Sequence, residues 1–205
     1  VLFAVPVLAA VGTITTSPVS GPVGTLVSIS GSGFTAGSTY TVNFGSTPVA
    51  TGTIATPSGN LTATTFIVPT AVAGSHTISV TTGAGDTSNS RTFTIIPQIT
   101  LSSTSVTAGS TIIVTGTGFG ASRTVTIYVD STARTTTATS SVGTFSVGLQ
   151  IPTGAGGTHT VTATDSASNV ASTTYTIIPS ISLSTSSVTV GSQITVTGTN
   201  YVAST

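Results

Sequence analysis

The chain has 205 residues, a formal net charge of zero and only 3% charged residues, which excludes several classes of function. Its three cations are Arg91, Arg123 and Arg134, too few and too scattered to neutralise the phosphates of a nucleic acid or to dock on anionic lipid. Cysteine is absent, so disulfides and thiol chemistry are excluded too. Serine and threonine make up about four residues in ten, far above ordinary globular usage, and with valine and isoleucine they favour strands.

The first segment in chain order, residues 1–13, is apolar and carries no charge. It is shorter than the roughly 20 residues that cross a bilayer, and Pro6 interrupts a helix there, so we expect no membrane span. A remnant of an export signal is one interpretation. In the other, the segment is a strand with no sheet of its own, whose apolar face is made of Val1, Phe3, Val5, Val7 and Val11.

Two repeats follow, over residues 14–97 and 98–179, and a third copy begins over residues 180–205. Equivalent positions recur at spacings of 85 and then 82 residues, as shown by Gly24, Gly109 and Gly191 and by Phe34, Phe119 and Tyr201. A fixed period of this kind indicates one structural unit per repeat.

Within each repeat, apolar residues alternate with serine and threonine. The clearest examples are Val27 and Ile29, then Ile112 and Val114, then Ile194 and Val196. A period of two predicts strands with one buried face, and about seven strands at a spacing of about 8–12 residues are typical of a sandwich. We therefore predict an all-β chain: two tandem immunoglobulin-like β-sandwiches, a partial third of two strands, and an N-terminal strand available for donation.

A short motif follows the second expected strand of each copy. It reads Gly31-Ser32-Gly33-Phe34 in the first, Gly116-Thr117-Gly118-Phe119 in the second and Gly198-Thr199-Asn200-Tyr201 in the partial third. The motif resembles that of IPT/TIG and related bacterial and archaeal immunoglobulin-like repeats of surface proteins. This resemblance covers both repeats and the partial copy, and it implies the fold rather than a ligand.

Candidate catalytic and metal-ligating residues are few. His76 and His159 occupy equivalent positions, and we interpret each as a half-buried ring that hydrogen-bonds backbone, with no carboxylate partner nearby in sequence. Asp86 and Asp165 lie in loops with asparagine, where they satisfy turn amides or, alternatively, contribute to a weak calcium site. Nucleophilic catalysis needs a base with an orienting partner, so we expect neither an enzyme nor a cofactor.

Asn60 heads an N-glycosylation sequon, Asn60-Leu61-Thr62, in a turn before an expected strand. Such a site acquires a glycan only in an exported protein. N-glycans are therefore candidate partners, and we expect an extracellular location.

The partial third copy raises the question of what completes it. Two strands alone are marginal in water, and their apolar residues, among them Ile194, Val196 and Tyr201, invite pairing. The chain is then either a fragment of a longer cell-surface stalk or adhesin, or it exchanges strands with copies of itself. A strand donated head to tail makes a contact that does not close and so builds a filament. This arrangement resembles archaeal surface threads and other donor-strand-complemented pili, which implies an exported, often glycosylated appendage.

Overall fold

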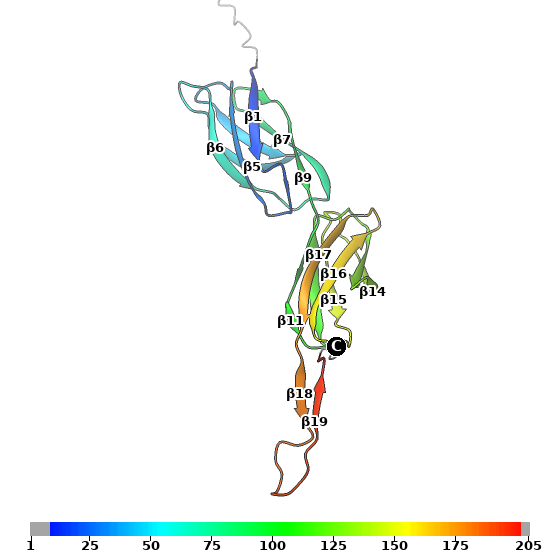
Figure 1. Cartoon of the computed structure of the whole chain (residues 1–205). Helices are drawn as coiled ribbons and strands as arrows, with labels where there is room; N and C mark the ends of the chain where they lie inside the picture. The colour runs from blue at the N-terminus through cyan, green and yellow to red at the C-terminus, as the bar shows by residue number, and fades with distance from the viewer. Residues whose placement is uncertain (1–8, 202–205) are drawn as a thin grey trace, which may run out of the picture. The chain divides into compact units, whose positions relative to one another are not determined.

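The computed structural model describes residues 9–201, and over that range it contains strands and no helix. The prediction of an all-β fold with tandem immunoglobulin-like sandwiches is confirmed. The chain divides into two compact units between Pro97 and Gln98. Each unit contains a β-sandwich, called here module 1 and module 2, and a two-stranded hairpin follows module 2 (Figure 1). Among the described residues, no helix is long and apolar enough to cross a membrane.

Module 1 consists of two sheets joined by their first strand. One sheet has the order β1-β3-β6, and the other contains β2, β9, β7, β4 and β5, with the short β8 beside β7. β1 crosses between them, because Val11 and Gly12 pair in parallel with β8 while the residues from Thr13 to Ser17 pair antiparallel with β3. The strands are β1 (Val11–Ser17), β2 (Ser20–Gly21), β3 (Leu26–Ser32), β4 (Thr39–Phe44), β5 (Thr47–Thr53), β6 (Leu61–Ile67), β7 (Gly74–Thr82), β8 (Thr87–Ser88) and β9 (Arg91–Ile95).

Module 2 repeats this plan with two separate sheets, β10-β12-β15 and β11-β17-β16-β13-β14. In the smaller sheet, β12 is the central strand and pairs antiparallel with both neighbours. The strands are β10 (Gln98–Leu101), β11 (Ser105–Val106), β12 (Thr111–Thr117), β13 (Thr124–Val129), β14 (Thr132–Ala138), β15 (Phe145–Gln150), β16 (Gly157–Asp165) and β17 (Val170–Ile177).

Each module has its own apolar core, produced by the period of two in its strands. In β12, Ile112 and Val114 are buried while Thr111, Ile113 and Thr115 are exposed. Opposite sheets contribute to the same cluster, and Phe119 packs edge to face on Phe145 with ring centroids 5.2 Å apart. Burial of such side chains removes apolar surface from water and is the main stabilising contribution to each module.

A buried carboxylate anchors the loops at one end of each module. Asp86 is only 2% exposed and accepts hydrogen bonds from the backbone N–H groups of Thr35 (2.7 Å) and Ala10 (3.1 Å) and from the Thr82 hydroxyl (3.0 Å). The Thr35 N–H makes the largest contribution and holds the pKa of Asp86 below its ordinary value of 3.8, although burial acts in the opposite direction.

Asp165 has the equivalent role in module 2. It accepts hydrogen bonds at 2.8 Å from the Gly120 N–H, the Ala167 N–H and the side-chain amide of Asn169. Burial raises the pKa of Asp165, but these donors outweigh it and keep the pKa below the ordinary value. The interpretation of both aspartates as residues that satisfy turn amides is confirmed.

We expect Asp86→Asn to lower the free energy of unfolding of module 1 by about 2 kcal/mol at neutral pH, because hydrogen bonds to a charged acceptor contribute about 1.5–3 kcal/mol and an amide NH₂ would face other donors. The pKa of Asp86 is lower in the folded state. Its stabilisation is therefore present above about pH 4 and is lost as the pH falls through the folded value. Thermal unfolding of the variant and the wild type at pH 7 and pH 2 measures both effects, and the module 2 transition at pH 7 is the internal control for the substitution. An unchanged module 1 transition at pH 7 would contradict the assignment.

Candidate functional site

The hairpin after module 2, residues 180–201, is a third copy of the strand pair that opens each module. It consists of β18 (Ser180–Leu183) and β19 (Val196–Thr199), which pair antiparallel (Figure 1). The same isoleucine–glycine register occurs in all three copies: Ile14 with Gly31, Ile99 with Gly116, and Ile181 with Gly198. The hairpin therefore has the backbone pairing of the opening strand pair of a module.

The turn hydrogen bonds of the hairpin also repeat those of module 2. Ser184 donates its N–H to the Thr195 carbonyl at 2.9 Å, and the Thr195 N–H donates to the Ser184 hydroxyl at 3.0 Å. In module 2, Ser102 and Ile113 make the same two bonds, at 3.0 Å and 2.9 Å. This local network forms in the hairpin without the other strands of a module.

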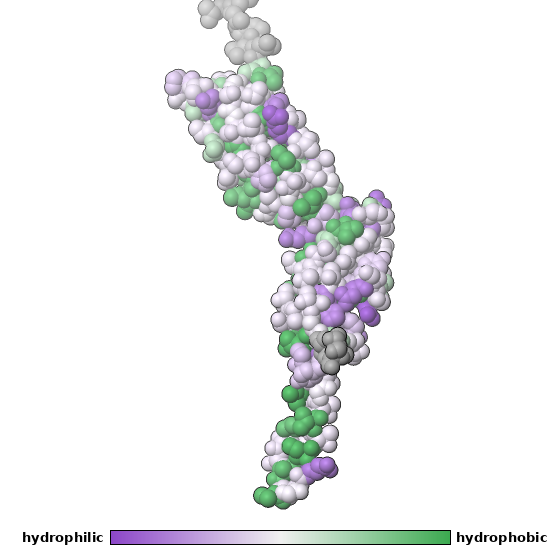
Figure 2. Space-filling view, viewed as in Figure 1, coloured by the Kyte–Doolittle hydropathy of each residue, from purple (hydrophilic) through white to green (hydrophobic). Residues whose placement is uncertain are grey.

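The side chains of the hairpin differ from their counterparts in exposure. Ile181 is 63% exposed whereas Ile99 is 5% exposed, and Val196 is 60% exposed whereas Val114 is fully buried. Figure 2 shows hydrophobic side chains gathered along the hairpin. The exposed large apolar residues of this segment are Ile181, Leu183, Val188, Val190, Ile194, Val196 and Tyr201. Contiguous exposed apolar surface of this kind marks an interaction site.

One edge of β19 has no partner among the described strands. In module 2 the equivalent edge of β12 pairs with β15, whereas the sheet of the hairpin contains β18 and β19 alone. Natural proteins commonly protect an open edge with lysine or another charge. Residues 166–205 contain no charged side chain, so this edge lacks that protection.

The candidate residues near the N-terminus fall in two groups. Val1, Phe3, Val5 and Val7 lie outside the described residues, so their assignment to a donor strand stays a prediction. Val11 belongs to β1 of module 1, which corrects its assignment to the segment before that module. The reason is a backbone contact, since Val11 pairs with Thr87 while its side chain is 74% exposed. Module 1 thus begins three residues before the expected boundary at residue 14.

Asn60 is exposed in the turn before β6, while the adjacent Leu61 is 2% exposed and belongs to the core. Its backbone carbonyl accepts a hydrogen bond from Ala55, and its N–H bonds the Ser58 hydroxyl at 3.4 Å. The sequon side chain is therefore accessible on a turn whose backbone is held in place.

Both histidines hydrogen-bond backbone carbonyls, as predicted. His76 bonds the Val72 carbonyl through Nε2 at 2.8 Å and stacks on Phe44, and His159 bonds the Ala155 carbonyl through Nε2 at 3.1 Å and stacks on Tyr175. These ring contacts are structural, because they place each imidazole against the core at a strand corner.

Neither histidine has a carboxylate partner nearby in sequence, but the fold brings a distant one, Asp130, to His159. Its Nδ1 lies 2.5 Å from Asp130 Oδ2, although the two residues are 29 apart in sequence. The hydrogen bond to Asp130 raises the pKa of His159 above 6.5, with burial opposing, and the same bond lowers the pKa of Asp130. The sequence contained one indication of this pair. When the two repeats are aligned, Asp130 occupies the position at which module 1 has Gly45.

This histidine–aspartate pair does not form a catalytic arrangement. Nδ1 is bound to the carboxylate and Nε2 to a backbone carbonyl, so neither nitrogen faces a hydroxyl that it could activate. Within residues 9–201 no group of three or more His, Cys, Asp or Glu side chains is placed to hold a metal ion. The weak calcium site considered for the loop aspartates is not favoured either, since their oxygens accept hydrogen bonds from N–H and O–H donors.

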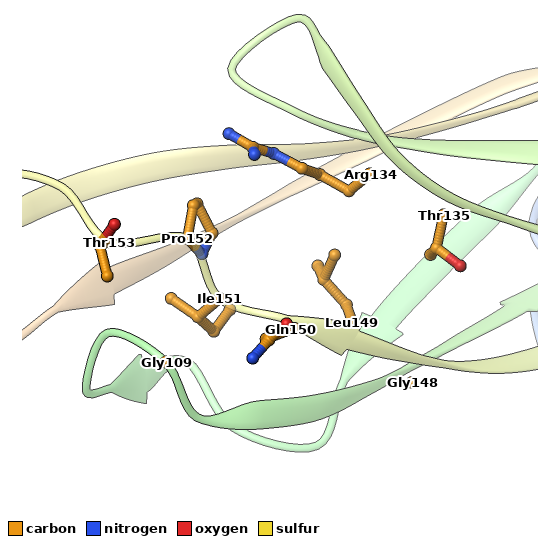
Figure 3. Close-up of a pocket in the computed structure, with 9 residues that line it drawn as sticks. All are labelled: Gly109, Arg134, Thr135, Gly148, Leu149, Gln150, Ile151, Pro152 and Thr153. Carbon is orange, nitrogen blue, oxygen red and sulfur yellow. The ribbon is translucent and has the colours of Figure 1, made fainter.

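A pocket of about 520 Å³ lies in module 2 between the edge strands β14 and β15 (Figure 3). Arg134 and Thr135 come from β14, Gln150 from β15, and Thr153 from the loop that follows. Leu149 and Ile151 also line it, but both are almost fully buried and belong to the core. The pocket therefore presents one guanidinium and several neutral polar groups, and it presents no carboxylate or imidazole.

Two tandem β-sandwiches followed by the opening hairpin of another copy place the chain among proteins built from repeated immunoglobulin-like modules. The chain belongs to the IPT/TIG domain family, whose model matches residues 13–95 and 95–177. The resemblance carried by the Gly-x-Gly-Phe motif is thus confirmed for both modules. A comparison with curated proteins found no match.

Several solved structures are similar to this chain. The Yersinia pseudotuberculosis adhesin InvE is 16% identical over 81% of this chain and 58% of its own, with a TM-score of 0.36. The BSP domain of a biofilm associated protein is 22% identical over 80% of this chain and 30% of its own, with a TM-score of 0.29. The fibronectin(III)-like modules of Clostridium thermocellum CbhA are 18% identical over 80% and 92%, with a TM-score of 0.27. The chain thus spans less than two thirds of the length of the first two proteins.

We expect Asp130→Gly, which introduces the glycine of module 1, to lower the pKa of His159 because it removes the carboxylate that raises it. The contribution of His159 to stability is present below about pH 6.5 and is lost as the pH rises through its raised folded pKa. That of Asp130 is present above about pH 4, so the variant should differ most from the wild type between these values. NMR titration of the imidazole protons measures the shift. The His76 signal, from module 1, should be the same in both proteins, and an unmoved His159 curve would contradict the pairing.

Proposed function

We propose that the chain is a structural subunit of an extracellular filament, in which copies are joined head to tail by a donated β-strand. The observation that carries this proposal is the hairpin of residues 180–201. It has the register and turn hydrogen bonds of a module's opening strands, yet its core-type side chains are exposed and no described strand pairs with one edge of β19. Strand addition satisfies an open edge and covers apolar side chains in the same step.

The N-terminal segment supplies the strand. Residues 1–8 are apolar and uncharged, and they precede the first strand of module 1 in the sequence. Because donor and acceptor lie at opposite ends of the sequence, their pairing between copies is heterologous and repeats indefinitely. The partner of this chain is therefore another copy of itself.

Composition supports an assembly role. The chain has three Arg, three Asp and neither Lys nor Glu, so it lacks the mixed surface charge that keeps soluble domains apart. The exposed Asn60 sequon fits export and an N-glycan, which would add a hydrated group to an otherwise weakly solvated surface. An extracellular appendage combines these features.

The second candidate function is a segment of a longer cell-surface stalk or adhesin made of tandem modules. The matching of the family model to two consecutive repeats favours it, because such arrays are extended by adding copies. In this case the hairpin is completed by strands of its own module, and the purified chain forms no polymer.

We expect Ile181→Thr in the hairpin to prevent or sharply reduce filament formation, because it removes apolar surface from the acceptor. Ile67→Thr in module 1 is the matched control, since both isoleucines are 63% exposed. Both variants should keep the thermal unfolding of the wild type, as neither side chain belongs to a core. Electron microscopy and sedimentation compare the three proteins. Equal polymerisation of all three would exclude the hairpin as a contact.

Deletion of residues 1–8 should abolish filaments without unfolding module 1. The deletion spares β1 and leaves Ala10, whose N–H bonds Asp86, in place. Electron microscopy of the full and shortened chains decides the matter, with circular dichroism as the folding control. Filaments from both forms, or from neither, would contradict strand donation by this segment, and the absence of filaments from both favours the stalk.

A further inference from the structure

We infer that the donated strand adds to the free edge of β19 with Phe3 of a second copy opposite Gly198, Val5 opposite Val196 and Val7 opposite Ile194. This inference rests on the proposed function and gives it a specific acceptor and register. It follows from treating the hairpin as the opening pair of a module, to which no third strand is added within residues 9–201.

The acceptor register comes from module 2, where β15 occupies the equivalent edge of β12. There Phe145 lies opposite Gly116, Val147 opposite Val114 and Leu149 opposite Ile112. A shift of 82 residues carries the three β12 positions onto Gly198, Val196 and Ile194. The missing strand should therefore present an aromatic residue and then two aliphatic residues at alternate positions.

The N-terminal segment has this pattern. Residues 3–7 read Phe-Ala-Val-Pro-Val, and residues 145–149 of β15 read Phe-Ser-Val-Gly-Leu. The inward positions are aromatic, valine and aliphatic in both, and the position between the first two is a small residue, Ala4 or Ser146. Ser146 is exposed in β15, so the equivalent Ala4 would lie on the outer face of the extended hairpin sheet.

Pro6 fits this register because it falls where no N–H is needed. It would lie opposite Thr195, whose N–H and carbonyl both bond Ser184 on the β18 side. On the opposite edge of β19, Thr195 therefore forms a non-hydrogen-bonded pair with the added strand. In such a pair, the residue of the added strand directs its own N–H away from β19. Proline is tolerated on an edge strand of a sheet at positions where the backbone nitrogen faces solvent. A slip by one residue would place Pro6 at a position that must donate.

Gly198 is a position that an aromatic ring can cover closely. In module 2, a Cβ atom on Gly116 would overlap the ring of Phe145, which packs edge to face on Phe119. In the hairpin, the Tyr201 ring lies 2.9 Å from a Cβ built on Gly198, so Tyr201 itself covers this glycine there. The inferred register therefore requires Tyr201 to move aside when Phe3 takes the position that corresponds to Phe145.

A second copy is the occupant because the chain enters and leaves module 1 at opposite ends. Val11 pairs with Thr87, which pairs with Thr81 near one end of β7, whereas Ile95 pairs with Gly74 at the other end. The segment before β1 is thus separated from its own hairpin by at least the length of module 1. The segment of a second copy can reach the hairpin without that separation.

Site-directed disulfide formation tests this register, because the wild type has no cysteine and introduced thiols have no competitors. One purified protein carries Ala4→Cys and the other Thr197→Cys, which the inference places opposite each other in a non-hydrogen-bonded pair. Cα atoms in such a pair are about 4.5 Å apart, within disulfide range. Thr195→Cys is the matched control, since Thr195 and Thr197 are both exposed, and a slip of two residues places the Cα atoms more than about 7 Å apart.

Oxidation of the mixture is expected to give the Ala4→Cys/Thr197→Cys dimer and to give none with Thr195→Cys. Equal linking to both positions, or to Thr195→Cys alone, would overturn the register. Filaments that require residues 1–8 but show neither cross-link would overturn β19 as acceptor while leaving the proposed function standing. A chain carrying both Ala4→Cys and Thr197→Cys that links to itself as a monomer would overturn the second copy. Absence of both filaments and cross-links would overturn the function and the inference together.

Discussion

The constraint on which this molecule depends is that a strand with alternating side chains produces a sheet with one apolar face, and that face must be covered. In each module a second sheet covers it, and the residues concerned, such as Val114 and Ile127, have no exposed surface. The same alternation continues into residues 180–201, where the described structure contains no second sheet and Val196 remains exposed. The proposals about assembly follow from this comparison: the hairpin has the local structure of the opening strands of a module, but its apolar side chains are not buried.

Two of the six charged side chains are buried and act inside the modules. Asp86 and Asp165 accept hydrogen bonds from N–H and O–H donors and hold loops in place. The other four, Arg91, Arg123, Asp130 and Arg134, are exposed, although Arg91 also donates from Nε to the Ile14 carbonyl at 2.6 Å. None of the six lies in residues 166–205. The proposed contacts through the hairpin would therefore consist of apolar side chains and backbone hydrogen bonds, which ionic strength screens very little.

The sequence was sufficient for the fold because period, spacing and the repeated Gly-x-Gly-Phe motif are local properties. Contacts between residues that are distant in sequence were harder to predict. The bond between His159 and Asp130 joins neighbouring strands, and only the replacement of Gly45 by Asp130 at equivalent positions indicated it. Val11 was misassigned because backbone pairing with β8, rather than its exposed side chain, places it in module 1. The pocket beside Arg134 depends on how two sheet edges approach, which no local pattern encodes.

The free edge of β19 also has a direction. An antiparallel strand can join it only one way round, so an array assembled as proposed above would have two different ends, one with an unoccupied hairpin and the other with the proposed donor segment, residues 1–8, unpaired. The two ends of such an array would then depend on different segments of the chain for further growth. A chain without residues 1–8 would still offer its hairpin to the donor segment of a growing array and would leave the array without a donor at that end. A free peptide with the sequence of those residues would occupy the hairpin instead and block the opposite end.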